Sequence, residues 1–210
     1  MANKKKKQVL EEESWLEEES WDKEEESWGK FFRGVLVMYL VFVLAMFLLF
    51  VSICYVVFSF FLANEVVSGP SMQPTFEDGD RLIAVRRFTP KRNDVVIIKA
   101  PKQPAAMYIK RLIGLPGDTA QSKNDVLYIN GKKVAQQYLN NKYKKADHLL
   151  GVTYTNNFKV KLKKNQYWVM GDHRDVSNDS RRFGPVSRSA ILSKVVLRYW
   201  PVTQISSNFY

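Results

Sequence analysis

The longest uncharged run of the chain constrains its fold more than any other feature. Residues 34–63 contain no Asp, Glu, Lys or Arg and consist mainly of Val, Leu, Phe and other apolar side chains. About 20 such residues in a helix cross the hydrocarbon core of a bilayer, so this run is long enough for one span. A soluble core helix would have to bury apolar side chains on every face. The run therefore predicts a single transmembrane anchor.

Positive charges near the two ends of the run predict its orientation. Lys23, Lys30 and Arg33 precede it, whereas the first Lys or Arg after it is Arg81. Lys and Arg beside a span tend to stay in the cytoplasm, and acidic residues have little effect. We therefore expect a single-pass cell-membrane protein with a cytoplasmic N-terminus and an extracytoplasmic domain. A removable signal peptide fits less well, because its apolar segment is only about 7–15 residues long.

Residues 1–33 form a low-complexity tail in which Glu-Glu-Glu-Ser-Trp occurs three times. The spacing of the repeats would place the three Trp side chains on one side of a helix that lies on the membrane. Disorder is an equal alternative, because mostly polar residues bury too little surface to offset the entropy of ordering. The sequence leaves both alternatives open and gives this acidic tail no catalytic role.

The charge of the chain is divided unevenly. Residues 1–30 hold six Lys against ten Asp or Glu, a net charge of −4, and the rest holds 26 basic against 11 acidic residues, a net charge of +15. A basic extracytoplasmic surface meets anionic lipid headgroups and wall polymers rather than nucleic acid. An ordinary solvated surface explains the charge equally well. The only cysteine, Cys54, lies in the apolar run, so the outer domain folds without disulfides.

Short β-rich runs alternate with turn signals beyond the anchor and predict a mainly β fold. Asn130-Gly131 separates residues 126–129 from residues 132–134, which is typical of a tight hairpin because both turn residues need positive φ. We expect one β-rich domain at 64–210, with its strands between about 66 and 205 and a loop-rich insertion at 135–158. The other predicted strands are 81–85, 94–98, 108–113, 161–164, 167–170 and 190–200.

Three motifs follow the anchor in order. Residues 68–76 read Ser-Gly-Pro-Ser-Met-Gln-Pro-Thr-Phe, residues 108–118 read Tyr-Ile-Lys-Arg-Leu-Ile-Gly-Leu-Pro-Gly-Asp, and residues 171–181 read Gly-Asp-His-Arg-Asp-Val-Ser-Asn-Asp-Ser-Arg. Together they resemble the motifs of bacterial type I signal peptidases, the Ser-Lys dyad serine proteases, in the single-anchor form of Gram-positive bacteria. The resemblance extends from about residue 66 to residue 200, with Asp94-Val95-Val96 as a weaker intervening match.

The resemblance implies a catalytic dyad of Ser71 as nucleophile and Lys110 as general base. A serine hydroxyl needs a neighbouring base, and a lysine can serve if burial lowers its pKa. Apolar neighbours of Lys110 such as Ile109 and Ile113 make that burial reasonable. The two histidines are interpreted as bystanders. The implied activity is removal of signal peptides from exported preproteins after small residues of the Ala-x-Ala type, with no cofactor, no metal and no obligate protein partner.

Other roles are also implied by the resemblance. The backbone N–H of Ser71 would stabilise the oxyanion, while Gly69 stands where some relatives have a serine that adds a second donor. Ser177 would hold the amine of Lys110. Two ion pairs, Asp179 with Arg181 and Asp172 with Arg111, would support the site. The expected walls of the substrate pocket are Val67, Met72, Phe76, Tyr108 and Ile109, although some of these could instead be core residues.

Two other functions compete with a signal peptidase. A membrane-tethered, noncatalytic basic β-module could bind anionic cell-wall polymers, but the presence of both Ser71 and Lys110 argues against it. Self-cleaving repressors of the DNA-damage response use the same Ser-Lys dyad, but they act on DNA in the cytoplasm, so the anchor argues against this alternative. Nucleic acid is not an expected partner, whereas the lipid bilayer is.

Overall fold

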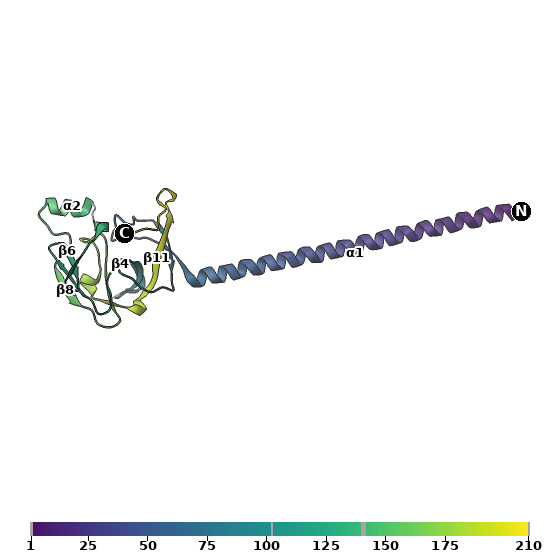
Figure 1. The fold of residues 1–210 in the computed structure, drawn as a ribbon. Helices are drawn as coiled ribbons and strands as arrows, with labels where there is room; N and C mark the ends of the chain where they lie inside the picture. Colours follow the sequence, from purple (N-terminus) through teal and green to yellow (C-terminus); the bar gives the residue numbers. More distant parts are fainter. Residues whose placement is uncertain (1, 102, 140–141, 210) are drawn as a thin grey trace. The chain divides into compact units, whose positions relative to one another are not determined.

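The computed structural model describes residues 2–101, 103–139 and 142–209, without the side chains of residues 2–27 and 104. The chain forms two compact units, Met1–Val57 and Phe58–Tyr210, and each is considered by itself. The first unit is helical, and the second holds the strands and short helices (Figure 1).

Helix α1 (Ala2–Phe61) includes both the repeat-rich tail and the apolar run. The backbone of residues 2–33 is thus helical, and the placement of this helix on the membrane stays a prediction. Among the described residues, Trp28–Phe61 is the one helical stretch long and apolar enough to cross a membrane. Its large apolar side chains are exposed all round, as a helix in lipid requires and a core helix does not allow. The helix ends at Phe61, so the last two residues of the predicted anchor belong to a strand.

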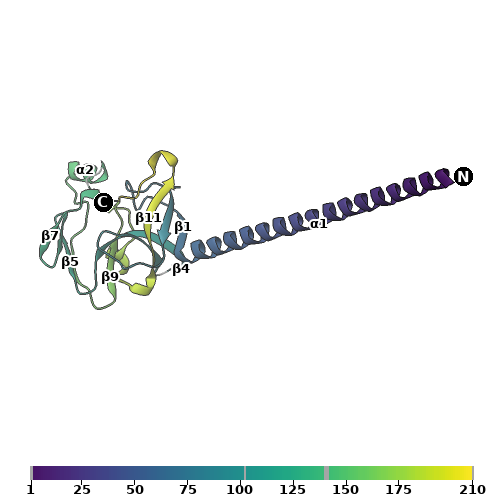
Figure 2. The ribbon, with the colours of Figure 1, turned by 45° about the vertical axis from the view of Figure 1, so that its right-hand side comes forward.

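The described strands of the second unit form two antiparallel sheets, which confirms the predicted mainly β fold (Figure 2). The larger sheet has the order β1-β2-β11-β3-β4-β9-β10, and the smaller has the order β7-β6-β5-β8. The strands of the larger sheet are β1 (Leu62–Val66), β2 (Arg81–Val85), β3 (Val95–Ala100), β4 (Gln103–Gly114), β9 (Gln166–Met170), β10 (Val186–Ser187) and β11 (Ile191–Trp200). The strands of the smaller sheet are β5 (Thr119–Lys123), β6 (Val126–Ile129), β7 (Lys132–Val134) and β8 (Phe158–Lys161).

The predicted hairpin is confirmed by strands β6 and β7. Ile129 faces Lys132 across the turn, and the two turn residues have the positive φ angles that a tight turn needs, 52° at Asn130 and 79° at Gly131. Strand β8 begins three residues before the predicted run 161–164 and ends at its first residue, because the chain turns after Lys161 and buries Leu162 in the core of the small sheet.

The segment predicted as a loop-rich insertion contains helical structure. It holds the 3₁₀ turn η1 (Gln137–Leu139) and helix α2 (Lys142–Leu149). Asp125, in the turn before β6, fixes this segment to the small sheet. Its carboxylate accepts hydrogen bonds from the Thr155 amide at 2.5 Å and from His148 Nε2 at 2.7 Å. These contacts join residues distant in the sequence, so the local pattern did not reveal them. The remaining short helices are α3 (Ser180–Phe183), η2 (Arg188–Ala190) and η3 (Val202–Gln204).

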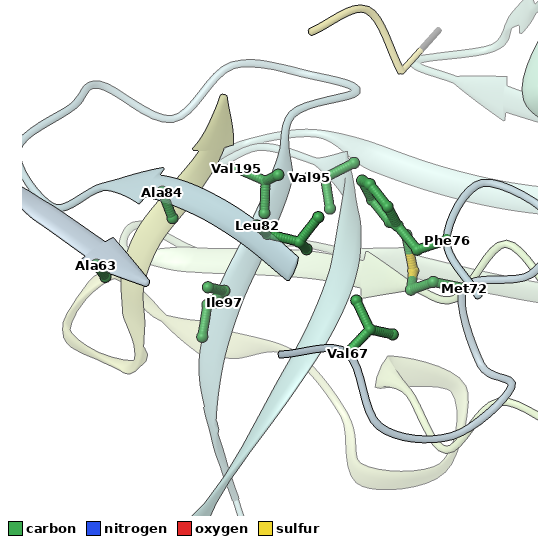
Figure 3. Packing of buried hydrophobic residues seen from close by; sticks show 9 residues of the cluster. All are labelled: Ala63, Val67, Met72, Phe76, Leu82, Ala84, Val95, Ile97 and Val195. Carbon is green, nitrogen blue, oxygen red and sulfur yellow. The ribbon is translucent and has the colours of Figure 1, made fainter. Parts of the chain in front are cut away.

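One hydrophobic cluster fixes the loop between β1 and β2 to the large sheet (Figure 3). Met72 and Phe76 of this loop are 1% and 0% exposed and pack among side chains of β2, β3 and β11. Burying each such side chain contributes about 1.5–3 kcal/mol to folding. The loop that carries Ser71 is therefore held by its own apolar residues. The cluster consists of Ala63, Val67, Met72, Phe76, Leu82, Ala84, Val95, Ile97 and Val195.

Candidate active site

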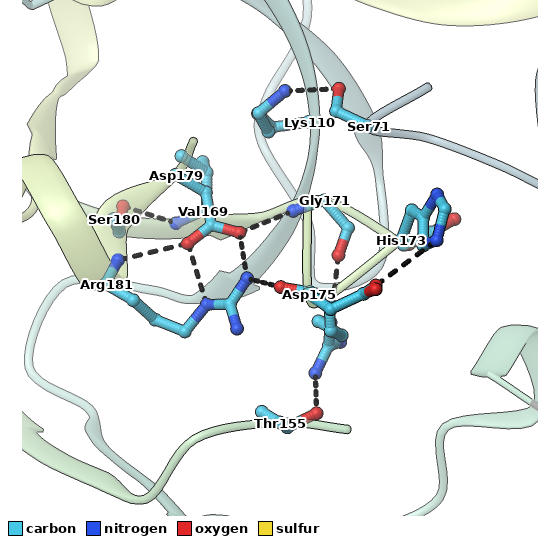
Figure 4. Close-up of polar contacts among 12 residues, drawn as sticks. Ser71, Lys110, Thr155, Val169, Gly171, His173, Asp175, Asp179, Ser180 and Arg181 are labelled. Carbon is cyan, nitrogen blue, oxygen red and sulfur yellow. Dashed lines mark hydrogen bonds and ion pairs between the residues drawn. The ribbon is translucent and has the colours of Figure 1, made fainter. Parts of the chain in front are cut away.

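The side chains of Ser71 and Lys110 lie against each other (Figure 4). Ser71 lies in the loop after β1, and Lys110 lies in the second half of β4, where it pairs with Val96 of β3. Lys110 Nζ is 2.8 Å from Ser71 Oγ and donates a second hydrogen bond to the Ile109 carbonyl, also at 2.8 Å. A neutral amine at that distance can accept the hydroxyl proton, so the pair has the geometry of a nucleophile and its base.

Burial tunes Lys110 for this role. The side chain is 3% exposed, and desolvation lowers its pKa from 10.5 to about 8. The carboxylates of Asp179 and Asp172 act in the opposite direction, since negative charge favours the ammonium, but burial is the larger effect. The Tyr108 ring, 5.3 Å from Nζ, covers the amine on one side. Roughly one tenth of Lys110 is therefore neutral at pH 7.

The backbone around Ser71 offers one donor for a developing oxyanion. Within the described residues, the Ser71 amide makes no hydrogen bond. The Gly69 amide already donates to Asp78 Oδ1 at 2.8 Å. Gly69 has a φ of 85°, a conformation that favours glycine, and a Cβ there would meet open space. Gly69 thus shapes the turn before the nucleophile, and its own N–H is occupied.

Asp179 holds the third motif in place and forms the expected ion pair with Arg181. Its carboxylate accepts from Arg181 Nη2 at 2.8 Å, from Arg181 Nε at 2.9 Å and from the Gly171 amide at 3.0 Å, and it caps α3. Burial raises the pKa of this carboxyl, but the hydrogen bonds and the charge of Arg181 outweigh burial, so the pKa lies below its ordinary value. Asp179 therefore stays ionised and orders the loop behind Lys110.

The second expected pair joins the lysine motif to the third motif. Arg111 binds Asp172 through two hydrogen bonds, Nε to Oδ1 at 2.8 Å and Nη2 to Oδ2 at 2.6 Å, and neither side chain is exposed. Thr75, from the nucleophile motif, donates to the same carboxylate at 2.6 Å. A buried pair of this kind is costly to break, because the remaining charge would be left without a partner. Asp172 thus links all three motifs.

Gly171 has a role that the sequence did not reveal. A Cβ at this position would lie closer than 3.0 Å to the Ser177 hydroxyl and to the Ser71 carbonyl oxygen. Only glycine lets the third motif approach the nucleophile this closely. Glycine within a motif is the one sequence signal that could have suggested such an approach.

Ser177 does not form the expected hydrogen bond to Lys110. Its side chain is 1% exposed, and its Oγ has no hydrogen-bond partner among the described residues. The hydroxyl packs against Gly171 instead. A buried hydroxyl without a partner costs free energy, so this position is not explained by stability.

The predicted pocket walls are only partly in position. Val67, Met72 and Phe76 are 3%, 1% and 0% exposed and belong to the core cluster, which is the alternative that the sequence left open for them. Their apolar character reflects the packing that anchors the nucleophile loop. Ile109 is half-buried and packs against the same cluster. Tyr108 is also half-buried and lines a hollow of about 210 Å³ together with Pro101, Gln103, Asn178, Arg182 and Phe183.

The two histidines differ in their positions. His148 lies on α2 and pairs with Asp125, away from the dyad. His173 is 7% exposed and lies against the nucleophile motif, where its Nδ1 donates to the Pro70 carbonyl at 3.2 Å. It makes no hydrogen bond to Ser71 Oγ among the described contacts. The sequence did not predict the contact between His173 and Pro70, or that the Tyr143 ring covers His173.

The described residues contain no group of three His, Cys, Asp or Glu arranged to hold a metal ion.

Comparison with known proteins places this geometry in a family. Residues 37–200 match the signal peptidase family, peptidase S26. Signal peptidase IB of Staphylococcus aureus strain Mu50 is 37% identical over 174 residues, which cover 75% of this chain and 87% of the relative. Signal peptidase I of Bacillus licheniformis is 41% identical over 153 residues, which cover 70% and 81%.

A crystal structure of a signal peptidase I from Enterococcus faecalis V583 is 32% identical and covers 51% of this chain and 97% of that chain, with a TM-score of 0.47. The family match spans most of the chain, and the two relatives are matched over most of their length. The chain therefore belongs to the signal peptidase family, peptidase S26, and with it to the bacterial type I signal peptidases, which are serine endopeptidases.

Proposed function

We propose that this chain removes signal peptides from exported preproteins with Ser71 as the nucleophile and Lys110 as the general base. One observation carries the assignment, the 2.8 Å contact between Ser71 Oγ and the buried amine of Lys110. The matching relatives are signal peptidases by name, and membership of the family does not support the alternative of a noncatalytic wall-binding module.

The proposed reaction begins when neutral Lys110 accepts the proton of the Ser71 hydroxyl as the oxygen attacks the scissile carbonyl. The Ser71 amide donates to the oxyanion that forms. The protonated Lys110 then gives its proton to the leaving amine, and an acyl group remains on Ser71. A water molecule, deprotonated by the same lysine, attacks the acyl carbonyl, and Lys110 returns the proton to Ser71 Oγ as the bond between Oγ and the signal peptide breaks. Each step leaves Lys110 in the protonation state that the next step needs.

The hollow beside Tyr108 is the proposed place for a small side chain of the substrate. Its volume of about 210 Å³ is modest, and Tyr108, which lines it, has its ring centroid 5.3 Å from the catalytic amine. An extended substrate segment along β4 would gain main-chain hydrogen bonds that do not depend on sequence. That mode suits cleavage of many preproteins after small residues.

The proposed topology has residues 1–33 in the cytoplasm, residues 34–63 in the bilayer and residues 64–210 outside. It rests on Lys23, Lys30 and Arg33 before the span and on the distance to Arg81 after it. Protease added to right-side-out vesicles should digest the domain and leave the first thirty residues intact. Protection of the domain would contradict this orientation.

The activity is tested by incubating the purified full chain with a preprotein that carries Ala-x-Ala, followed by mass mapping of the products. We expect a single cut after the second Ala of the motif. The same preprotein with Phe at the last position before the cut should stay intact, and so should the original preprotein with a Ser71→Ala enzyme. A cut at other positions, or an active Ser71→Ala enzyme, would refute the proposal.

A further inference from the structure

Helix α2 contacts the loop that carries the nucleophile, although the sequence predicts this part of the chain as a loop-rich insertion. The nucleophile loop is defined here as residues 70–73. The Tyr143 hydroxyl donates to the side-chain carbonyl oxygen of Gln73 at 3.0 Å. The amide of Gln73 in turn donates to Glu77. Because Gln73 stands two positions after Ser71, the hydrogen bond from Tyr143 joins α2 directly to the nucleophile loop.

His173 contacts the same loop at its backbone. Its N–H donates to the Ser71 carbonyl at 3.2 Å, and its ring Nδ1 donates to the Pro70 carbonyl, also at 3.2 Å. The ring is nearly buried, and its Nε2 lies 3.2 Å from Asp175 Oδ1. The Tyr143 ring covers the His173 ring at a centroid distance of 3.8 Å. In Figure 4, His173 lies to the right of Gly171 and below Ser71.

These contacts hold the nucleophile loop from two segments that are distant in the sequence. The loop lies outside the strands, so no sheet hydrogen bonds fix Ser71. A displacement of about 1 Å at a reacting atom lowers turnover by about 100-fold. We propose that Tyr143 and His173 are positioning residues, which keep Ser71 Oγ facing Lys110 Nζ by clamping the nucleophile loop. This inference rests on the proposed role of Ser71.

The test compares Tyr143→Phe, Tyr143→Ala and His173→Ala in the full chain, with Lys145→Gln as a control. Lys145 is exposed on the same helix, so its substitution should leave activity unchanged. Turnover, KM and thermal unfolding are measured on one preprotein. Tyr143→Ala should lower kcat about tenfold and Tyr143→Phe about threefold, because Phe keeps the ring contact and loses one hydrogen bond. His173→Ala should lower kcat about tenfold, because the ring contacts with Pro70 and Tyr143 are lost. In all three, KM should change less than about twofold.

A double-mutant cycle separates positioning from general loss of structure. If Tyr143 acts through Gln73, then Tyr143→Phe should have no further effect on kcat in a Gln73→Ala protein. If Tyr143→Phe lowered kcat by the same factor in the wild-type protein and in the Gln73→Ala protein, Tyr143 would not act through Gln73, and the inference would be overturned. That result would count against it even if the substitution also destabilised α2. Unchanged kcat in a folded Tyr143→Ala protein would also overturn it.

The inference and the proposed function fail in different ways. An inactive Ser71→Ala enzyme beside a fully active Tyr143→Ala enzyme would reject only the clamp. An active Ser71→Ala enzyme would reject the proposed nucleophile, and the clamp with it. The clamp is supported if kcat falls in the Tyr143 and His173 variants and if Tyr143→Phe causes no further loss in the Gln73→Ala protein.

Discussion

Lys110 has to be neutral before it can accept the Ser71 proton, so turnover should follow the titration of this amine. With a pKa of about 8, roughly one tenth of the enzyme is active at pH 7 and roughly nine tenths at pH 9. At a pKa of 10.5, the neutral fraction at pH 7 would be roughly one in 3,000. Burial therefore raises the neutral fraction by about 300-fold, equivalent to about 3 kcal/mol. Substitution by Arg keeps the charge at every accessible pH and should abolish turnover.

The assay is kcat for the full chain between pH 6 and pH 10, on a preprotein whose cleavage region has no titratable side chains. Turnover should rise about tenfold from pH 6 to pH 7 and level off above about pH 9. The control is Lys145→Gln, which removes an exposed charge and should leave the profile unchanged.

Three results would refute this reasoning. A rise in kcat centred near pH 10.5 would mean that burial does not lower the pKa of Lys110. A limb near 6.5 that disappears in a His173→Asn enzyme would assign the base to the histidine that lies beside the nucleophile motif. Full activity of Lys110→Arg would exclude a lysine base altogether.

Four further outcomes are expected. Lys110→Met should stabilise the fold at pH 7 by about 3 kcal/mol, because the folded-state pKa is lowered and the native state carries a buried charge. Between about pH 8 and pH 10.5, Lys110 of the wild-type protein keeps its proton in the unfolded state and loses it in the folded state, so wild-type stability rises with pH in that window. The difference in Tm between the wild-type and Lys110→Met proteins should therefore shrink there. Gly171→Ala should cost about 3 kcal/mol and most of the activity, because the new Cβ would displace the Ser71 carbonyl, as thermal unfolding and turnover would show. Asp172→Asn should cost about 3–5 kcal/mol in denaturant unfolding, because the Arg111 charge stays buried without its partner. Ser177→Ala should leave Tm unchanged or raise it, because no hydrogen bond is lost; reduced kcat at unchanged Tm would show that the hydroxyl binds Lys110 only during turnover.

The sequence predicts those features that depend on short-range patterns. The uncharged run predicts the apolar helix, and Asn130-Gly131 predicts the hairpin because positive φ is a local requirement. The motifs also predict which of the many lysines stands beside Ser71. Each of these signals lies in one continuous stretch of sequence, two residues for the turn and thirty for the uncharged run, so no knowledge of the tertiary structure is needed.

Features that depend on long-range packing were not predictable in this way. The family resemblance named Met72 and Phe76 as pocket walls and left the core open as the alternative, and tertiary packing places both side chains in the core cluster. Tyr143 lies in a segment without periodicity, and its contact with His173 bridges thirty positions. The close approach of Gly171 to Ser71 spans a hundred positions. Only the folded arrangement of β4, β9 and the nucleophile loop brings these groups together.

The most direct measurement of the central claim is the turnover of Ser71→Ala, Lys110→Ala and the double variant on one preprotein, with product masses as the readout. Two residues that form one catalytic unit are not additive, so each single variant should lose all measurable cleavage and the double variant should be no worse. A Lys110→Ala enzyme that retains near-normal turnover would contradict the Ser71–Lys110 dyad.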